Sequence, residues 1–121
     1  MMTNNEIGKI YHRPWGTYQT LALNPGYQIK ILTVNPNGRL SLQRHFKRSE
    51  HWVVVAGAPT ITIDAETKVY RANENVFIPI ESLHRIENLT AEPCTIVEVQ
   101  VGDYLGEDDI ERIDDVYGRV V

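Results

Sequence analysis

Short runs of alternating apolar and polar residues dominate the chain. "TYQTLAL" at 17–23 and "YQIKILTV" at 27–34 flank an Asn-Pro-Gly sequence in which Pro25–Gly26 suits a type II turn. A period of two residues is typical of β-strands, because successive side chains point to opposite faces. In the second run, Tyr27, Ile29 and Ile31 share one face, and Gln28 and Lys30 share the other.

The same pattern continues to residue 101 with turn residues between the runs. Many short strands at regular spacing predict an all-β sandwich or barrel. Only "EDDIERIDD" at 107–115 is different, with acidic residues at its start and Ile110 and Ile113 three residues apart. This spacing predicts a short C-terminal helical segment. The predicted strands are "RLSLQRH", "HWVVVAG", "TITID", "KVYRA", "NVFIPI", "HRIENL" and "CTIVEVQV".

Composition limits the class of protein. A length of 121 residues predicts one domain over 1–121, and 42% hydrophobic residues suffice for a core. The net charge of −4 argues against a nucleic-acid partner. No run has the length of a signal peptide or membrane span, so we expect a cytoplasmic protein without a membrane partner. The single cysteine, Cys94, has apolar neighbours and is expected to be buried and without an internal disulfide.

Four potential metal ligands stand out along the predicted strands. Alternation places Gln43 and His45 on one face of a strand, and Glu50 begins the next strand after a turn around 46–49. His84 lies at the start of a much later strand. Two imidazoles, a carboxylate and an amide oxygen predict a site for one divalent metal ion without thiolate. Zn²⁺ is the first expectation, and Mn²⁺, Co²⁺, Fe²⁺ and Ni²⁺ stay open.

The spacing of these ligands resembles the two motifs of the cupin superfamily. Gln43 stands where the first motif has a histidine, and Asn73 and Glu81 replace two glycines of the second motif. The resemblance implies a jelly-roll barrel, also called a double-stranded β-helix, with the metal at its mouth. The matching residues of the first motif are Gly38, His45, Glu50 and Gly57, and those of the second are Pro79, His84 and Asn88.

A narrower resemblance covers Arg13 to Arg119. "RPWG", "LSLQRH", "SEHW", "HRIEN", "EVQVGDYLGEDDI" and "YGR" are similar to the type II mannose-6-phosphate isomerase domain. That domain is usually the C-terminal part of a bifunctional enzyme with a mannose-1-phosphate guanylyltransferase. The resemblance implies metal-dependent interconversion of mannose 6-phosphate and fructose 6-phosphate, supplying GDP-mannose for polysaccharide biosynthesis. These residues contain no Gly-rich phosphate loop, so nucleotidyl transfer is not expected of them.

Two other functions remain open at this point. One is a different metal-dependent cupin enzyme, such as another sugar isomerase or an oxygenase, since a barrel of this kind supports many activities. The other is a non-catalytic cupin that binds a sugar phosphate, as partner of a separate guanylyltransferase.

Isomerisation requires a base and a site for the substrate phosphate. His51 is the first candidate base, although alternation places it opposite Glu50, and Glu81 is the second. Arg48 lies within a family motif and is a third catalytic candidate. The phosphate-binding candidates are Lys47, Arg85 and Arg119.

The N-terminal segment "EIGKIYHRPWG" carries apolar residues outside the two motifs. Such a segment could pair on a sheet edge. Because small cupins are often dimeric, we expect a homodimer.

Overall fold

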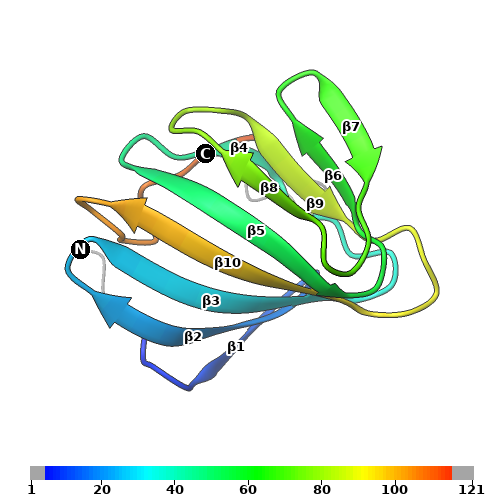
Figure 1. Cartoon of the computed structure of the whole chain (residues 1–121), viewed down its shortest axis with the longest axis horizontal. Helices are drawn as coiled ribbons and strands as arrows, with labels where there is room; N and C mark the ends of the chain where they lie inside the picture. Colours follow the sequence, from blue (N-terminus) through cyan, green and yellow to red (C-terminus); the bar gives the residue numbers. More distant parts are fainter. Residues whose placement is uncertain (1–4, 116–121) are drawn as a thin grey trace.

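A computed structural model describes residues 5–115 and contains two antiparallel sheets (Figure 1). The six-stranded sheet has the order β1-β2-β3-β10-β5-β8, and the five-stranded sheet has the order β11-β4-β9-β6-β7. The first sheet comprises β1 Ile10–Arg13, β2 Gly16–Asn24, β3 Tyr27–Val34, β10 Cys94–Gly102, β5 Arg48–Ala56 and β8 Asn75–Ile78. The second comprises β11 Glu111–Asp114, β4 Leu42–Arg44, β9 His84–Glu87, β6 Thr60–Ile63 and β7 Glu66–Val69. The all-β prediction is therefore confirmed.

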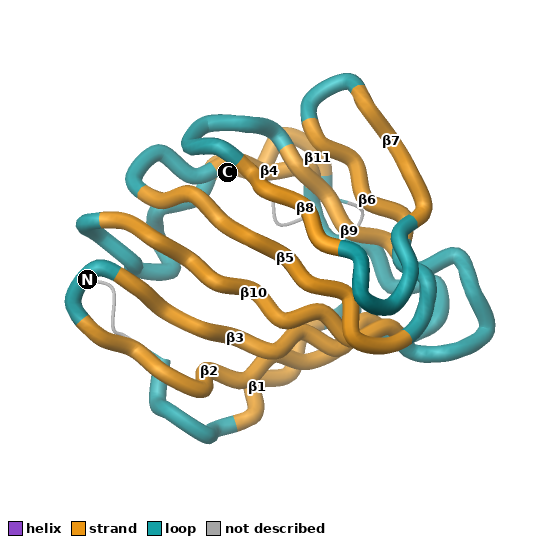
Figure 2. Tube along the Cα trace, viewed as in Figure 1, coloured by secondary structure: helices purple, strands orange, loops and turns teal. Residues whose placement is uncertain are grey.

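The predicted helix over 107–115 is wrong. Within the described residues Figure 2 shows strands and loops only, and 111–114 form β11, which pairs with β4. Ile110 is half-buried and Ile113 is 46% exposed, so the two do not form one apolar helix face. A segment this short has little helical stability of its own, whereas the edge of β4 offers backbone hydrogen bonds. Ion pairs of Arg44 with Glu111 at 2.6 Å and of Arg85 with Asp114 at 3.0 Å reinforce that pairing.

The inward faces of the central strands are divided into two layers. On β10, Cys94 and Ile96 are buried in the apolar layer, and Glu98 and Gln100 are buried in the polar layer. The neighbouring strand β3 is divided into the same two layers, because the register places Leu32 beside Ile96 and Lys30 beside Glu98. Gln28 and Lys30 therefore point inward. The predicted alternation is confirmed, but the polar face of 27–34 is the inner one.

The apolar layer is a closed hydrophobic core. Trp15, Trp52 and Cys94 are buried in it, as the sequence predicted for the cysteine. The other buried members are Tyr18, Leu32, Val34, Leu40, Val54, Ile61, Ile78, Ile86 and Ile96. The described part of the chain contains no helix long and apolar enough to span a membrane.

Candidate metal centre

Three of the four predicted ligands meet at the end of the barrel occupied by the polar layer. His45 follows β4, Glu50 lies on β5, and His84 is the first residue of β9. One potential ligand atom from each residue lies within 4.8 Å of the others, and all three residues are buried. The gap between His45 Nε2 and Glu50 Oε2 is 3.3 Å. The structure thus brings together side chains that are far apart in the sequence.

Backbone carbonyls fix the tautomers of both histidines. His45 Nδ1 lies 2.7 Å from the Asp109 carbonyl oxygen, and His84 Nδ1 lies 2.9 Å from that of Ser82. A carbonyl only accepts hydrogen bonds, so each Nδ1 carries the proton and each Nε2 keeps its lone pair. His84 Nε2 is buried with no hydrogen-bond partner among the described residues. An unsatisfied buried acceptor of this kind fits a metal ligand.

The protonation states also suit metal binding. Burial lowers the pKa of His45 to about 4, despite the nearby Glu50 carboxylate, and burial lowers the pKa of His84 as well. Burial on its own would raise the pKa of Glu50, but Arg48 and His45 bring it down to about 2. Two neutral imidazoles and one carboxylate are the protonation states that a divalent ion requires.

Two further contacts hold the Glu50 carboxylate in place. Arg48 Nε donates to Oε2 at 2.8 Å, and Trp52 Nε1 donates to Oε1 at 2.8 Å. Arg48 Nη2 also donates to His45 Nε2 at 3.2 Å. A metal ion bound at this nitrogen would take the place of that contact. The imidazole nitrogens and carboxylate oxygens of the cluster are otherwise ligand types that bind Zn²⁺ and the other candidate ions.

Gln43, the fourth predicted ligand, lies next to the cluster. It pairs with His84 in the register of β4 and β9, and its Oε1 accepts a hydrogen bond from Ser41 at 2.9 Å. It also lines a cavity of about 150 Å³ together with His45 and Glu50. Charged side chains on the remaining wall of this cavity are Arg13, Lys30, Arg48, Glu98, Glu107 and Arg112.

The three catalytic candidates have different environments. Arg48 is buried and lines the cavity, and its Nη1 has no hydrogen-bond partner among the described residues. His51 is exposed on the opposite face of β5, with its ring centroid 4.7 Å from that of Phe77. Glu81 is exposed in the turn after β8, at a φ of +70°. The structure brings Arg48 to the cavity but neither His51 nor Glu81.

Two of the three predicted phosphate-binding residues, Lys47 and Arg85, do not line the cavity. Lys47 is exposed in the turn between β4 and β5. Arg85 ties β9 to its neighbours, donating to the Leu40 carbonyl at 3.1 Å and to Asp114 at 3.0 Å. Arg119 lies outside the described residues.

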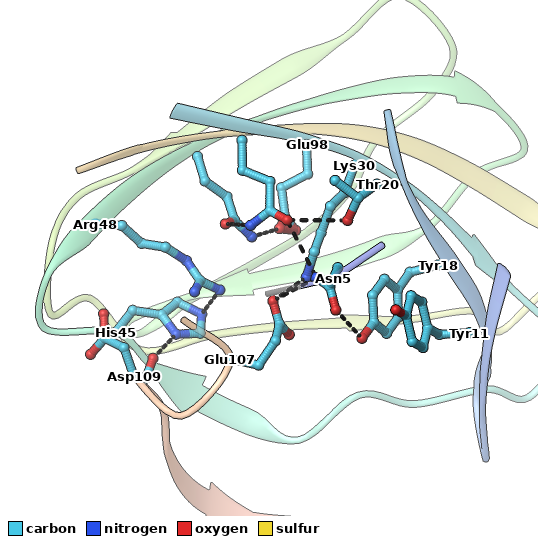
Figure 3. A network of polar contacts seen from close by, with 12 residues as sticks. Asn5, Tyr11, Tyr18, Thr20, Lys30, His45, Arg48, Glu98, Glu107 and Asp109 are labelled. Atoms are coloured by element: carbon cyan, nitrogen blue, oxygen red, sulfur yellow. Dashed lines mark hydrogen bonds and ion pairs between the residues drawn. The ribbon is translucent and has the colours of Figure 1, made fainter. Parts of the chain in front are cut away.

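The acidic segment 103–110 closes over this end of the barrel. The Asp109 carboxylate accepts hydrogen bonds from the backbone N–H groups of Phe46 and Lys47, both at 2.9 Å. Glu107 reaches the interior and pairs with Lys30 (Figure 3), with 2.8 Å between Glu107 Oε2 and Lys30 Nζ. The segment therefore contributes to the site through both backbone and side chains.

Sequence reasoning missed Lys30, Glu98, Glu107 and Asp109. For Lys30 and Glu98 the available signal was a polar residue at every second position within apolar strands, as in "VEVQV" and "YQIKI", whereas Glu107 and Asp109 lie in a loop without this pattern. Such residues usually face solvent in a half-buried strand, so alternation alone does not reveal an inward polar face.

A family model described as "Mannose-6-phosphate isomerase C-terminal" matches residues 3–115. The chain belongs to this isomerase family. The alginate biosynthesis protein AlgA of Pseudomonas aeruginosa is 50% identical over 108 residues, which is 89% of this chain and 22% of AlgA. A mannose-1-phosphate guanylyltransferase of Escherichia coli K12 is 46% identical over 116 residues, which is 96% of this chain and 24% of that protein. The isomerase-family chain spans less than a quarter of the length of these relatives.

Solved structures show that the isomerase-family chain has a cupin fold. The cupin domain of Schizosaccharomyces pombe Cnp3 matches with a TM-score of 0.73 at 11% identity, covering 78% of this chain and 69% of that one. Oxalate decarboxylase of Bacillus subtilis, in a structure concerned with its Mn(II) centres, matches with a TM-score of 0.75 at 18% identity. The latter match covers 87% of this chain and 30% of the decarboxylase. The predicted cupin resemblance is confirmed.

Proposed function

We propose that this domain is a metal-dependent isomerase that interconverts mannose 6-phosphate and fructose 6-phosphate. One observation carries the proposal: two neutral imidazoles and a carboxylate form a buried cluster, and two of its members, His45 and Glu50, line a cavity that also contains cationic side chains. Membership of the isomerase family supports the same activity. The names of the relatives support a role in supplying GDP-mannose for polysaccharide biosynthesis.

His45, Glu50 and His84 would hold one divalent ion, with Gln43 as a fourth ligand. Such an ion polarises carbonyl and hydroxyl oxygens of a bound sugar. We propose Zn²⁺ first, because its preferred ligands are of these types. The donor set equally accepts Mn²⁺, and the structural similarity to a decarboxylase with Mn(II) centres supports testing that ion.

The cations of the cavity would bind the anionic end of the substrate. Lys30 and Arg48 have buried side chains, where a charge-assisted hydrogen bond to phosphate is stronger than on the surface. The unpartnered Arg48 Nη1 is a donor ready for a substrate oxygen. Arg119 and the exposed Lys47 stay proposed phosphate contacts, whereas Arg85 does not line the cavity and is bound to Leu40 and Asp114.

A coupled assay for fructose 6-phosphate formation tests the activity. The chelated protein is expected to be inactive and to regain activity when one divalent ion is added back. The His84→Ala variant is the control, since it should stay inactive at the same metal concentration. An active chelated protein would overturn the metal dependence, and an inactive metal-loaded protein would overturn the isomerase activity.

A non-catalytic sugar-phosphate-binding domain is the second candidate. The buried cations support it, because they would bind phosphate whether or not turnover follows. Calorimetry separates the two functions, since binding of mannose 6-phosphate without turnover favours this second one. Binding by a separate guanylyltransferase is a further proposal, tested by co-elution of the two proteins.

We also propose a homodimer. β1 is an edge strand of the six-stranded sheet; its first residue, Ile10, is 54% exposed, and Ile7, which precedes the strand, is 61% exposed. An open edge of this kind can pair with a second copy. Light scattering should return twice the mass of the chain, and the mass of a single chain at micromolar concentration would refute the dimer.

A further inference from the structure

Glu98 is a buried carboxyl group that the metal cluster does not use. It lies in the middle of β10, is 5% exposed and lines the cavity. The register places it between Lys30 on β3 and Trp52 on β5. Burial of a carboxylate is costly unless it is paired or hydrogen-bonded, so a fold that retains one in a cavity is a candidate for function.

A chain of three hydrogen bonds ends at one oxygen of this carboxyl group. The Thr20 hydroxyl donates to Gln28 Oε1 at 3.1 Å, and Gln28 Nε2 donates to Gln100 Oε1 at 2.8 Å. Gln100 Nε2 then donates to Glu98 Oε2 at 2.6 Å. Figure 3 shows this network beside Lys30 and Arg48. Because each amide both accepts and donates, the chain fixes the orientation of Glu98 from one side.

The neighbouring cations are already paired with other carboxylates. Lys30 Nζ lies 2.8 Å from Glu107 Oε2, and Arg48 Nε lies 2.8 Å from Glu50 Oε2. Among the described residues, none forms an ion pair with Glu98, and its Oε1 receives no hydrogen bond. Burial raises the pKa of Glu98 to about 7, with a contribution from Glu50 that Lys30 and Arg48 oppose. A carboxyl group of this kind can both accept and release a proton near neutral pH.

We propose that Glu98 is the acid–base group that moves a proton between C2 and C1 of the sugar phosphate. The inference rests on the proposed isomerase activity. The Glu98 carboxylate takes the proton from C2, the C2–H electron pair forms the C1=C2 bond, and the C1=O electron pair moves to O1, which takes the proton of the neighbouring O2 hydroxyl. The Glu98 carboxylic acid then returns its proton to C1, to which the C1=C2 electron pair moves, as the O2 lone pair forms the C2=O carbonyl. The net change moves one hydrogen from C2 to C1 and one proton from O2 to O1.

Other titratable groups are less suitable for this step. His51 and Glu81 are exposed and do not line the cavity. Glu50 is engaged by Arg48 and Trp52 and belongs to the metal cluster. Glu107 is neutralised by Lys30. Glu98 combines a place in the cavity wall, a fixed orientation and an oxygen that no side chain occupies.

The Glu98→Gln variant separates a catalytic role from a structural one. Glutamine can still accept the hydrogen bond from Gln100, so a purely structural residue would tolerate the change. On our proposal, kcat for mannose 6-phosphate falls by at least about 100-fold, the usual contribution of an acid–base group. Melting temperature and metal content should stay as in the wild type, and KM should change by less than about threefold. The acid limb of the pH–rate profile should also disappear.

Two further variants make the outcome decisive. Glu98→Asp keeps the charge but shortens the side chain, which moves the carboxyl group away from the sugar. A fall in kcat of at least about tenfold is therefore expected, and this variant also serves if Glu98→Gln does not fold. Glu87→Gln is the matched control, because Glu87 is half-buried on β9 and pairs with Arg39 instead of lining the cavity. A folded, metal-loaded Glu98 variant with kcat within threefold of the wild type overturns the inference and leaves the isomerase activity intact. A wild-type protein without turnover overturns the activity itself.

Discussion

The apolar and polar layers of the barrel are built on the same strands but do different things. On β10, Cys94 and Ile96 are followed by Glu98 and Gln100, and all four point inward. The apolar layer stabilises the fold by removing hydrocarbon from water. The polar layer contributes less of this stabilisation, and its buried charged groups are stabilised by hydrogen bonds and ion pairs. One half of a strand can therefore stabilise the fold, while the other half supplies polar side chains to the cavity.

The largest expected effect tests the apolar layer. Ile96 is fully buried, so Ile96→Ala should lower the free energy of unfolding by about 2–5 kcal/mol through lost burial and a cavity. Urea unfolding of the metal-free protein measures this, and metal affinity should change by less than about threefold. Val97→Ala, on the outward side of β10, is the control with a smaller loss. Equal losses in both variants would mean that the inward face has no special role.

The pH dependence of stability tests the polar layer. The pKa of His45 is about 4 in the folded protein against an ordinary 6.5, so the folded state binds fewer protons in this range. The free energy of unfolding of metal-free protein should therefore fall as pH drops from about 6.5 to 4, by on the order of 3 kcal/mol. His45→Gln should reduce this slope. Superimposable pH profiles for His45→Gln and wild type would refute the assignment of this pH dependence to His45.

Loss of one ligand should affect the metal site and spare the apolar layer. His84→Ala removes an imidazole whose Nε2 is otherwise unsatisfied, so metal affinity should fall by at least about 100-fold, or roughly 2.7 kcal/mol. Elemental analysis after dialysis measures the bound metal, and the melting temperature of the chelated protein serves as the control. Full metal occupancy in this variant would show that His84 is not a ligand.

The smallest effects distinguish buried from exposed cations. Lys30→Met removes a buried ammonium group from the cavity wall and should raise KM for mannose 6-phosphate by about tenfold, the value of one charged hydrogen bond. Lys47→Met, at an exposed turn, should raise KM by no more than about threefold. A larger effect at Lys47 would move the phosphate site outside the cavity.

The sequence predicted the fold and the cluster of His45, Glu50 and His84 better than the rest of the cavity. The spacing that resembles the cupin motifs pointed to His45, Glu50 and His84, and the structure brings these three side chains together. Alternation also placed His51 opposite Glu50, and the structure bears out that geometry. The role of Glu98 depends on cross-strand neighbours, which a linear pattern does not contain. The helix predicted over 107–115 failed for the same reason, since the edge of β4 decides its conformation.

The contacts of Asp109 have a consequence for the order of assembly during translation. The carbonyl that fixes the His45 tautomer and the carboxylate that caps the β4–β5 turn both belong to a residue synthesised long after His45 and Glu50. A nascent chain that ends at β10 would have the strands of the first sheet but lack the group that orients His45. A domain that is synthesised from its N-terminus forms the contacts of its last residues late. We therefore expect high-affinity metal binding only after the segment that contains Asp109 has been synthesised.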